Sequence, residues 1–486
     1  MRAAWERANL VFSIKLRTLQ GSRSKAWRAA TLLLGALLLL WPALYNGFPL
    51  LYPDSMTYLA DGAPVARALF LHKFSAYYGV RSLLYSLVIL PFHWNFTAWP
   101  VAGLQCLLTA WVLWLLVRIM APRRSTCKYL GLIFLLSIFT SVSWYSSFIM
   151  PDILGPLAYL CFFLLVYTGQ SLARWERLSL CALACWGITA HATHLPLAAG
   201  LCVLLALFAL CEWKQLRLRL SGLAQAATVI VLAVAAQMGL NAYLYGAPTL
   251  NGERPPYLLA RLLGDGPGQL YLRQHCAQQQ WALCAHLERI GDDPDVFLWG
   301  PDGVYANGSE EEQQRIRQEE MPLVKAVLRT YPRQQLQISA ANFRNQLLAF
   351  GPYGFDPSPW LEEQFASTLI PARASYLRSR QARNLLPLDP LASLQRWVVF
   401  ISLGTISLLA ALFRLRLGAR LWALCGTVFA LIVANAALTG VLSVVDDRYG
   451  CRIIWLIPLL AGIFVLEAGG RLRAPWKHSA PAPGNS

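Results

Sequence analysis

The chain has 486 residues, of which 56% are hydrophobic and only 14% are charged. Soluble globular proteins carry about a quarter charged residues, so this composition excludes an ordinary soluble protein. Several runs, such as 31–42 and 221–240, contain no charged residue and approach or reach the ~20 residues that cross a bilayer. The sequence therefore predicts an all-α polytopic membrane protein.

The formal net charge of +17 comes from 42 Lys and Arg residues against 25 Asp and Glu residues. In a soluble chain this excess would point to nucleic acid, but here the cations cluster between apolar runs, as in the cytoplasmic loops of membrane proteins. The first 28 residues hold seven Lys or Arg residues against one acid, Glu6. We therefore expect no nucleic-acid partner, a cytoplasmic N-terminus and an uncleaved first span.

With every basic cluster in the cytoplasm, the chain crosses the membrane ten times and the C-terminus is also cytoplasmic. The predicted spans cover 29–49, 98–118, 129–148, 154–171, 178–193, 195–212, 221–243, 396–414, 421–444 and 452–469. Segment 81–96 is apolar but short and contains Pro91. Counting it as an eleventh crossing would turn Arg123 and Arg124 outward, so we expect an interfacial or re-entrant helix there.

This topology divides the chain into four parts. They are a transmembrane module with a first outer loop at 50–97 (1–243), an outer domain (244–395), C-terminal spans (396–470) and a cytoplasmic tail (471–486). Apolar residues recur at helical spacing over 310–350, so we expect the outer domain to be mainly helical. Cys276 and Cys284 lie in this domain, where either a disulfide or two free thiols fit the sequence.

Ionisable side chains near a membrane are energetically costly, which makes them candidates for function. Asp54 follows the first span in the sequence Tyr-Pro-Asp-Ser at 52–55, with Tyr58 one helical turn later. A carboxylate at a dry, aromatic-rich membrane edge can act as a general base. The alternative is a helix cap, because a helix could begin here.

Asp152 follows Pro151 at the outer end of the third predicted span. Taken alone, this pair is typical of a helix N-terminus. On the predicted topology, however, Asp152 and Asp54 lie on the same face of the membrane. Two converging carboxylates are what acid–base chemistry or cation binding requires.

Two histidines, His191 and His194, lie at a tight outer turn. Their spacing would put both imidazoles on one helix face, but two ligands are a weak indication of a metal. Hydrogen bonding to a substrate and simple interfacial placement are the alternatives. A divalent cation is therefore left open, with Asp54, Asp152, His191 and His194 as its ligands, and no other cofactor is indicated.

The turn before the last span reads Asp-Asp-Arg-Tyr-Gly-Cys-Arg at 446–452. Arg448 and Arg452 could clamp a phosphate through their forked donors, whereas the alternative is a self-paired loop that caps two helices. Arg81, with Tyr85, is a weaker candidate of the same kind. The chain has no nucleotide-binding or kinase motif, which argues against nucleotide-driven work.

These motifs together resemble the GT-C superfamily of membrane glycosyltransferases, which use polyprenyl-phosphate-linked sugars and include the aminoarabinose transferases of lipid A and the protein O-mannosyltransferases. The resemblance rests on 52–55 with Tyr58, on Arg81-Ser-Leu-Leu-Tyr85, on Pro151-Asp152, on Arg448-Tyr449 and on the large late outer loop. It covers the layout of most of the chain, but only a few dozen residues match a motif.

The resemblance implies a GT-C-like bundle and an inverting sugar transfer on the periplasmic face of a bacterial inner membrane. The donor would be an undecaprenyl-type phosphate sugar, and the acceptor a lipid, a glycan or a protein. Asp54 would be the general base and Asp152 would orient a substrate group, while Arg448 and Arg452 would stabilise the departing phosphate. The other candidate binding residues are Tyr449, Arg81, Tyr52, Tyr58 and His194.

One departure from the family pattern concerns the acids of the first loop. Many members carry a paired acidic motif there, whereas the next acid after Asp54 is Asp61, which leaves metal dependence open. Two other functions remain. A transporter or flippase of a lipid-linked substrate would usually show two related halves, and no internal repeat is visible. A transferase resembling the O-antigen ligases would rely on outer Arg and His residues.

Overall fold

The computed structural model describes residues 26–75, 78–211, 216–250, 252, 254–413 and 417–472, with the backbone alone at 216–218 and 471–472. Most of the basic N-terminal flank and of the predicted tail 471–486 therefore lies outside the described residues. Every regular element within these ranges is a helix, and an isolated bridge between Leu50 and Phe148 is the only β pairing there.

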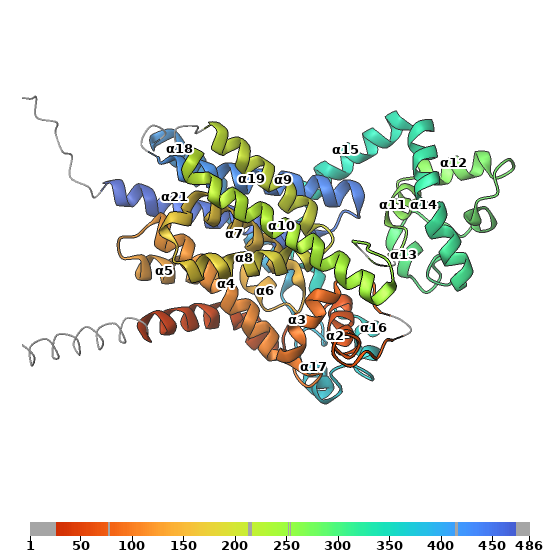
Figure 1. The fold of residues 1–486 in the computed structure, drawn as a ribbon, viewed down its shortest axis with the longest axis horizontal. Coiled ribbons are helices and arrows are strands. Elements are labelled where there is room, and N and C mark those ends of the chain that lie inside the picture. Colours follow the sequence, from red (N-terminus) through yellow and green to blue (C-terminus); the bar gives the residue numbers. More distant parts are fainter. Residues whose placement is uncertain are drawn as a thin grey trace, which may run out of the picture.

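Eight helices among the described residues are long and apolar enough to span a membrane, which confirms an integral, multi-pass membrane protein. They are the first helix Ala26–Asn46, α4 (Trp99–Met120), α7 (Leu154–Thr168) with its flanking turns η1 (Pro151–Ile153) and η2 (Gly169–Ser171), α9 (His194–Cys211), α10 (Leu216–Tyr245), α18 (Leu388–Phe413), α19 (Ala419–Leu442) and α20 (Asp447–Ile454) continued by α21 (Leu456–Leu472). They run side by side as one bundle (Figure 1).

The other two predicted spans, 129–148 and 178–193, coincide with shorter helices: α5 (Ser125–Phe139) and α8 (Arg174–Thr189). Each still carries the chain from one end of the bundle to the other. After α5 and the short α6 (Val142–Ser146), the carbonyl of Ser147 accepts a hydrogen bond from Leu50, just past the first span. After α8, the carbonyl of Thr189 accepts one from Ser82.

The two ends of the bundle differ in charge. One end, called the basic end below, carries described members of the predicted cytoplasmic clusters, those at 118–128 and 174–177. There Arg118 forms a bidentate ion pair with Glu176 at 2.7 and 2.8 Å. The opposite end, called the site end, carries Asp54, Asp152 and Arg448. This arrangement follows the rule that Lys and Arg collect in one set of loops.

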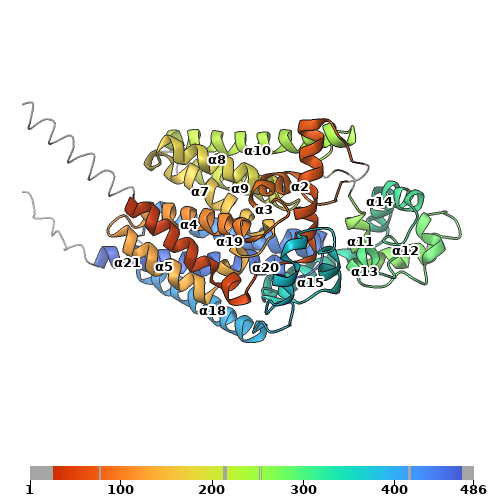
Figure 2. The ribbon, with the colours of Figure 1, turned by 90° about the horizontal axis from the view of Figure 1, so that it is seen from below.

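Two helices of the first outer loop cover the site end. Helix α2 (Pro53–Leu71) lies across the bundle, roughly perpendicular to the spans (Figure 2). Helix α3 (Leu83–His93) has 11 residues, which is too short to cross a bilayer. It packs against α2, where the backbone of Ser86 lies close to Gly62. Segment 81–96 is thus a short helix at the bundle end, as the sequence indicated.

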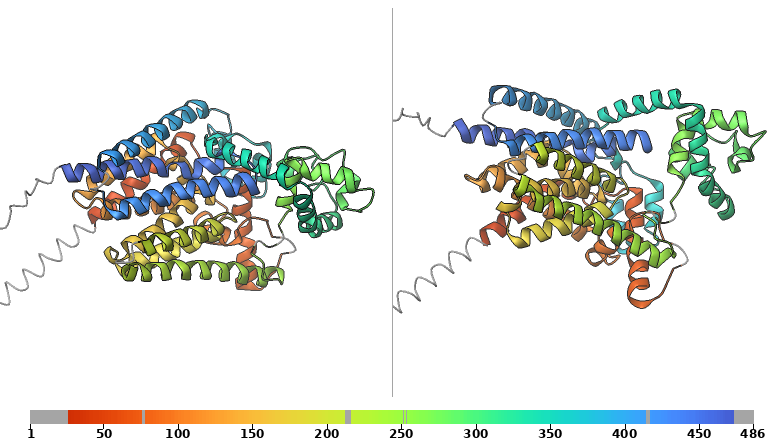
Figure 3. Two further views of the ribbon diagram at one scale, coloured as in Figure 1. Left: turned by 90° about the horizontal axis from the view of Figure 1, so that it is seen from above. Right: turned by 45° about the horizontal axis from the view of Figure 1, so that its top comes forward.

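The predicted outer domain 244–395 consists of two parts. Residues 257–331 form a helical subdomain with its own core, which includes Leu259, Ile316 and Leu323; it projects beyond the site end (Figure 3). Its elements are α11 (Tyr257–Gly264), α12 (Pro267–His275), η4 (Ala282–His286), α13 (Pro294–Trp299) and α14 (Glu310–Thr330).

The second part returns to the bundle. Helix α15 (Pro332–Leu348) packs along α19, and the side chains of Phe355, Phe365 and Tyr376 belong to the core of the bundle itself. The short elements here are η5 (Tyr353–Phe355), α16 (Pro359–Gln364), η6 (Ile370–Ala372) and α17 (Arg373–Leu377). This part is therefore a structural extension of the membrane bundle.

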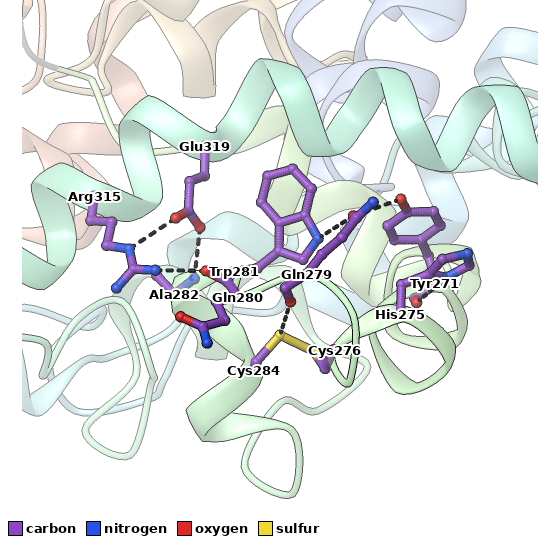
Figure 4. Close-up of a disulfide and its surroundings, with 10 residues drawn as sticks. All are labelled: Tyr271, His275, Cys276, Gln279, Gln280, Trp281, Ala282, Cys284, Arg315 and Glu319. Carbon is purple, nitrogen blue, oxygen red and sulfur yellow. Dashed lines mark hydrogen bonds and ion pairs between the residues drawn. A yellow bond between two sulfur atoms is a disulfide. The ribbon is translucent and has the colours of Figure 1, made fainter.

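Cys276 and Cys284 form a disulfide in the outer subdomain, which decides between the two alternatives that the sequence left open (Figure 4). The loop that it closes is held against α14. Glu319 accepts a hydrogen bond from the backbone N–H of Ala282 at 2.7 Å, and Arg315, paired with Glu319, donates to the carbonyl of Gln280.

Candidate functional site

Helix α2 places Asp54 and Tyr58 on one face. Pro53 occupies the first helical turn, where its missing N–H costs nothing, and the hydroxyl of Ser55 accepts a hydrogen bond from the backbone N–H of Tyr52. Tyr52 is therefore the N-cap residue, and Asp54 is not. Asp54 and Tyr58 are four positions apart, about one helical turn, so both side chains point toward the same neighbours.

The carboxylate of Asp54 lies between two guanidinium groups. Arg81, just before α3, donates to Asp54 at 2.7 Å, and a nitrogen of Arg448 lies 3.8 Å from its second oxygen. The side chains of Asp54 and Arg81 remain 15% and 25% exposed, which leaves them open to an entering molecule. Although burial lowers the pKa of Arg81, the effects of Asp54, Tyr257 and Tyr58 together outweigh it and raise this pKa above its usual value.

Arg448 is held in place by helix α20 and by two aromatic rings. The carboxylate of Asp446 caps the helix by accepting from the backbone N–H of Arg448 at 2.7 Å. The guanidinium lies 4.4 Å from the ring centre of Tyr52 and 5.1 Å from that of Tyr449. Asp446 of this turn therefore caps a helix, whereas the two arginines of the turn point toward Asp54 and Asp152.

Tyr52 is affected by the same charges. Arg448 lowers the pKa of its phenol, but burial and the carboxylates of Asp446 and Asp54 together outweigh that effect and raise the pKa to about 12. The phenol of Tyr52 therefore keeps its proton over the physiological pH range.

A second ion pair lies deeper in the bundle. Asp152, in η1, is 3.6 Å from Arg452, and their side chains are 1% and 2% exposed. Arg452 also donates to Thr193 at 3.1 Å and to Asn435 at 2.9 Å. Neither carboxylate oxygen of Asp152 has a hydrogen-bond partner among the described residues. Asp152 thus balances buried arginine charge and does not line the cavity described below.

The two histidines have different environments. His191 precedes α9 and lines the cavity, with its Nδ1 2.9 Å from the hydroxyl of Thr193. Burial, the neighbouring His194 ring and nearby arginines lower the pKa of His191 well below its usual value, so its imidazole is neutral. His194 begins α9, is fully buried, and bonds through Nδ1 to the carbonyl of Gly187.

The two imidazole centres lie 5.2 Å apart. No group of three or more His, Cys, Asp or Glu side chains is placed to hold a metal ion among the residues that the structure describes. The proposed ligands Asp54, Asp152, His191 and His194 are therefore not assembled as one set.

A cavity of about 620 Å³ opens beside the Asp54 cluster. Its polar side is formed by Arg81, Tyr58, His191, Tyr449, Arg254 and Tyr257. Its apolar side is formed by three spans: α9 with Leu195 and Pro196, α10 with Ala233 and Val234, and α19 with Leu438 and Leu442. The cavity thus joins charged groups at the site end to apolar helix faces at membrane depth, which suits an amphipathic molecule.

Several site residues escape sequence reasoning because their partners lie far away in the chain. Arg254 lines the cavity while it is paired with Glu320 of the outer subdomain at 2.9 Å. Trp299 lies 5.3 Å beneath the guanidinium of Arg81. Asn435 and Thr193 hold Arg452. None of these contacts leaves a periodic or local signal in the sequence.

No family model, curated protein or solved structure matches the chain. The chemistry of this cavity is therefore the basis on which a function is assigned.

Proposed function

We propose that the protein is a membrane glycosyltransferase that transfers a sugar from a polyprenyl-phosphate donor. The observation that carries this proposal is the cavity itself, in which Arg81, the ion-pair partner of Asp54, meets the apolar faces of α9, α10 and α19. A lipid-phosphate sugar has the same three parts: an apolar tail, an anionic phosphate and a polar sugar.

Partly exposed cations at the cavity support an anionic ligand. Arg81 lines the cavity and its side chain is 25% exposed, although it is paired with Asp54. Arg254 lines the same cavity and is 30% exposed, although it is paired with Glu320. A phosphate that binds Arg81 would make a bidentate, charge-assisted contact with its guanidinium group.

The same contact would prepare Asp54 for catalysis. In the unliganded site the carboxylate is occupied by Arg81 at 2.7 Å. When the donor phosphate takes over Arg81, Asp54 loses this partner and becomes a better proton acceptor. Asp54 then removes the proton of the acceptor hydroxyl, whose oxygen attacks the anomeric carbon. The bond between that carbon and the phosphate oxygen breaks, and the configuration inverts.

Arg448 and Arg81 would stabilise the negative charge that develops on the leaving phosphate. Asp152 and Arg452 act from behind the cavity, because Arg452 fixes Thr193, a lining residue of the cavity. We assign them positioning roles in this mechanism. On the topology given by the basic residues, the reaction takes place on the periplasmic face of a bacterial inner membrane, and the bundle is of the GT-C type.

The test is the variant Asp54→Asn, purified at full length and incubated with a native membrane lipid extract. Sugar transfer is measured by mass spectrometry of the lipid, glycan and protein fractions. Loss of a general base lowers the rate by roughly 100-fold or more. Glu363→Gln removes an exposed carboxylate and should transfer sugar at the wild-type rate. An Asp54→Asn variant with full activity would exclude this base, and lipid movement without any sugar product would favour a transporter.

A further inference from the structure

Residues 373–383 carry four arginines and no acid: Arg373, Arg378, Arg380 and Arg383. All four are exposed. The segment belongs to the long stretch between α10 and α18, at the site end of the bundle. Only short loops contribute to the charge rule that orients membrane proteins, so these arginines have no topological role to explain them.

The segment is fixed to the end of the first span. The side chain of Gln381 is fully buried, and it accepts a hydrogen bond from the N–H of Leu51 and donates one to the carbonyl of Leu51. The carboxamide of Asn46 accepts from the N–H of Gln381 at 2.7 Å. Arg380 donates to the carbonyl of Tyr45 and lies 4.4 Å above its ring.

This attachment puts the arginines at the membrane boundary. Asn46 is the last residue of the first span, and α18, another span, begins at Leu388, five residues after Arg383. Both spans present exposed apolar side chains along their length, such as Leu37 and Leu44 on the first and Phe400 on α18. The arginine segment at 373–383 therefore adjoins the exposed apolar surface of the first span and α18, at the level where a bilayer surface would lie.

Two of the four arginines have neither an ion pair nor an aromatic contact among the described residues. Arg373 pairs with Glu362 at 3.2 Å, and Arg380 is engaged with Tyr45. No carboxylate pairs with Arg378 or Arg383 in the described parts of the chain. Guanidinium groups that are exposed and unpaired beside a membrane match the geometry and charge of phosphate oxygens.

The rest of the outer region has the opposite charge. The subdomain at 257–331, which projects away from the bundle, contains eleven acids against seven Lys and Arg residues. Charge is thus sorted by position, with cations at the membrane boundary and an acidic excess away from it. An anionic bilayer surface would attract the first and repel the second.

We propose that residues 378–383 form a binding site for the phosphodiester headgroups of anionic phospholipids in the leaflet at the site end. The site holds these lipids beside the first span and α18, and it acts independently of sugar transfer. Because it also fixes which part of the outer region approaches the bilayer, it sets the orientation of the site end on the membrane surface.

The test uses full-length protein in detergent, titrated with dioleoyl phosphatidylglycerol and with dioleoyl phosphatidylcholine, with bound lipid counted by native mass spectrometry. Wild type should bind phosphatidylglycerol more tightly than phosphatidylcholine. R378Q/R383Q should bind phosphatidylglycerol roughly 25-fold more weakly, because each cation near an anionic surface contributes a factor of about five. R378K/R383K, which keeps the charge, should bind within a few-fold of wild type.

The matched control is R329Q/R333Q, which removes two exposed cations from the junction of α14 and α15; it should keep the wild-type preference. If the double glutamine variant does not fold, the single variants R378Q and R383Q are each expected to lose about fivefold. Unchanged affinity in the glutamine variants, an equal loss in the control, or equal competition by soluble glycerol phosphate would overturn the proposal.

Discussion

Asp61 lies on α2 and is the acid that follows Asp54 in the chain. One oxygen of its carboxylate accepts from the N–H of Gly79 at 3.3 Å, and the other has no partner among the described residues. Burial raises the pKa of Asp61 from 3.8 to about 6, although the Gly79 hydrogen bond lowers it somewhat. Because the pKa is higher in the folded protein, the ionised carboxylate destabilises the fold, fully above about pH 6 and not at all below the unfolded pKa.

We therefore expect Asp61→Asn to raise the free energy of unfolding by about 1–2 kcal/mol near neutral pH, since one pKa unit corresponds to about 1.4 kcal/mol and the group is partly exposed. This increase in the free energy of unfolding should shrink as the pH falls from about 6 to about 4. It is measured by comparing the thermal unfolding of the variant and the wild type in detergent across this pH range. A gain that does not depend on pH would show that ionisation of Asp61 is not its cause.

The buried Arg452–Asp152 pair makes a second prediction at the scale of single residues. Replacing Arg452 with Met would leave Asp152 buried without this partner, and breaking a buried pair from one side costs about 3–5 kcal/mol. The exposed pair Arg373–Glu362 is the control, with both side chains about half exposed. There, Arg373→Met should cost less than about 1 kcal/mol. Equal losses in the two variants, measured by thermal unfolding, would contradict this account.

At the scale of elements, the disulfide belongs to a unit with its own core. Closing a loop of this length contributes about 2–3 kcal/mol by the chain-entropy estimate. We expect Cys276→Ser with Cys284→Ser to increase hydrogen exchange in α11–α14 while the spans keep wild-type protection. Cys127→Ser, which removes an exposed free thiol, should leave hydrogen exchange unchanged both in α11–α14 and in the spans. Loss of protection in the spans would mean that the outer subdomain and the bundle unfold together.

The largest departure from the predicted elements concerns the third span. Apolar composition predicts one helix over 129–148, whereas α5 ends at Phe139 and the short α6 follows. The hydroxyls of Thr140 and Ser143 bond to backbone carbonyls in this region, at 2.6 Å each. Such local bonds compete with the helical ladder. A hydropathy pattern does not register this competition, because it averages over the whole run.

For the whole molecule, the sequence predicts the layout well and the site only in part. Charge distribution and apolar runs place the span ends within a few residues, as at 98–118 against Trp99–Met120. Scarcity of acids near the spans also singles out Asp54 and Asp152, and both carboxylates lie near Arg448. That Asp54 pairs with Arg81, which lines the cavity, depends on packing between α2 and α3, and no local pattern encodes that packing.

The position of α20 in the chain has a consequence for biosynthesis. Arg448 and Arg452 emerge from the ribosome after nearly all of the protein, yet they supply the countercharges for Asp54 and Asp152, which enter the membrane region much earlier. Until the last span inserts, the bundle holds a buried carboxylate without its arginine. We therefore expect a chain that stops short of this helix to lack part of its site and to leave the buried carboxylate of Asp152 without the charge of Arg452.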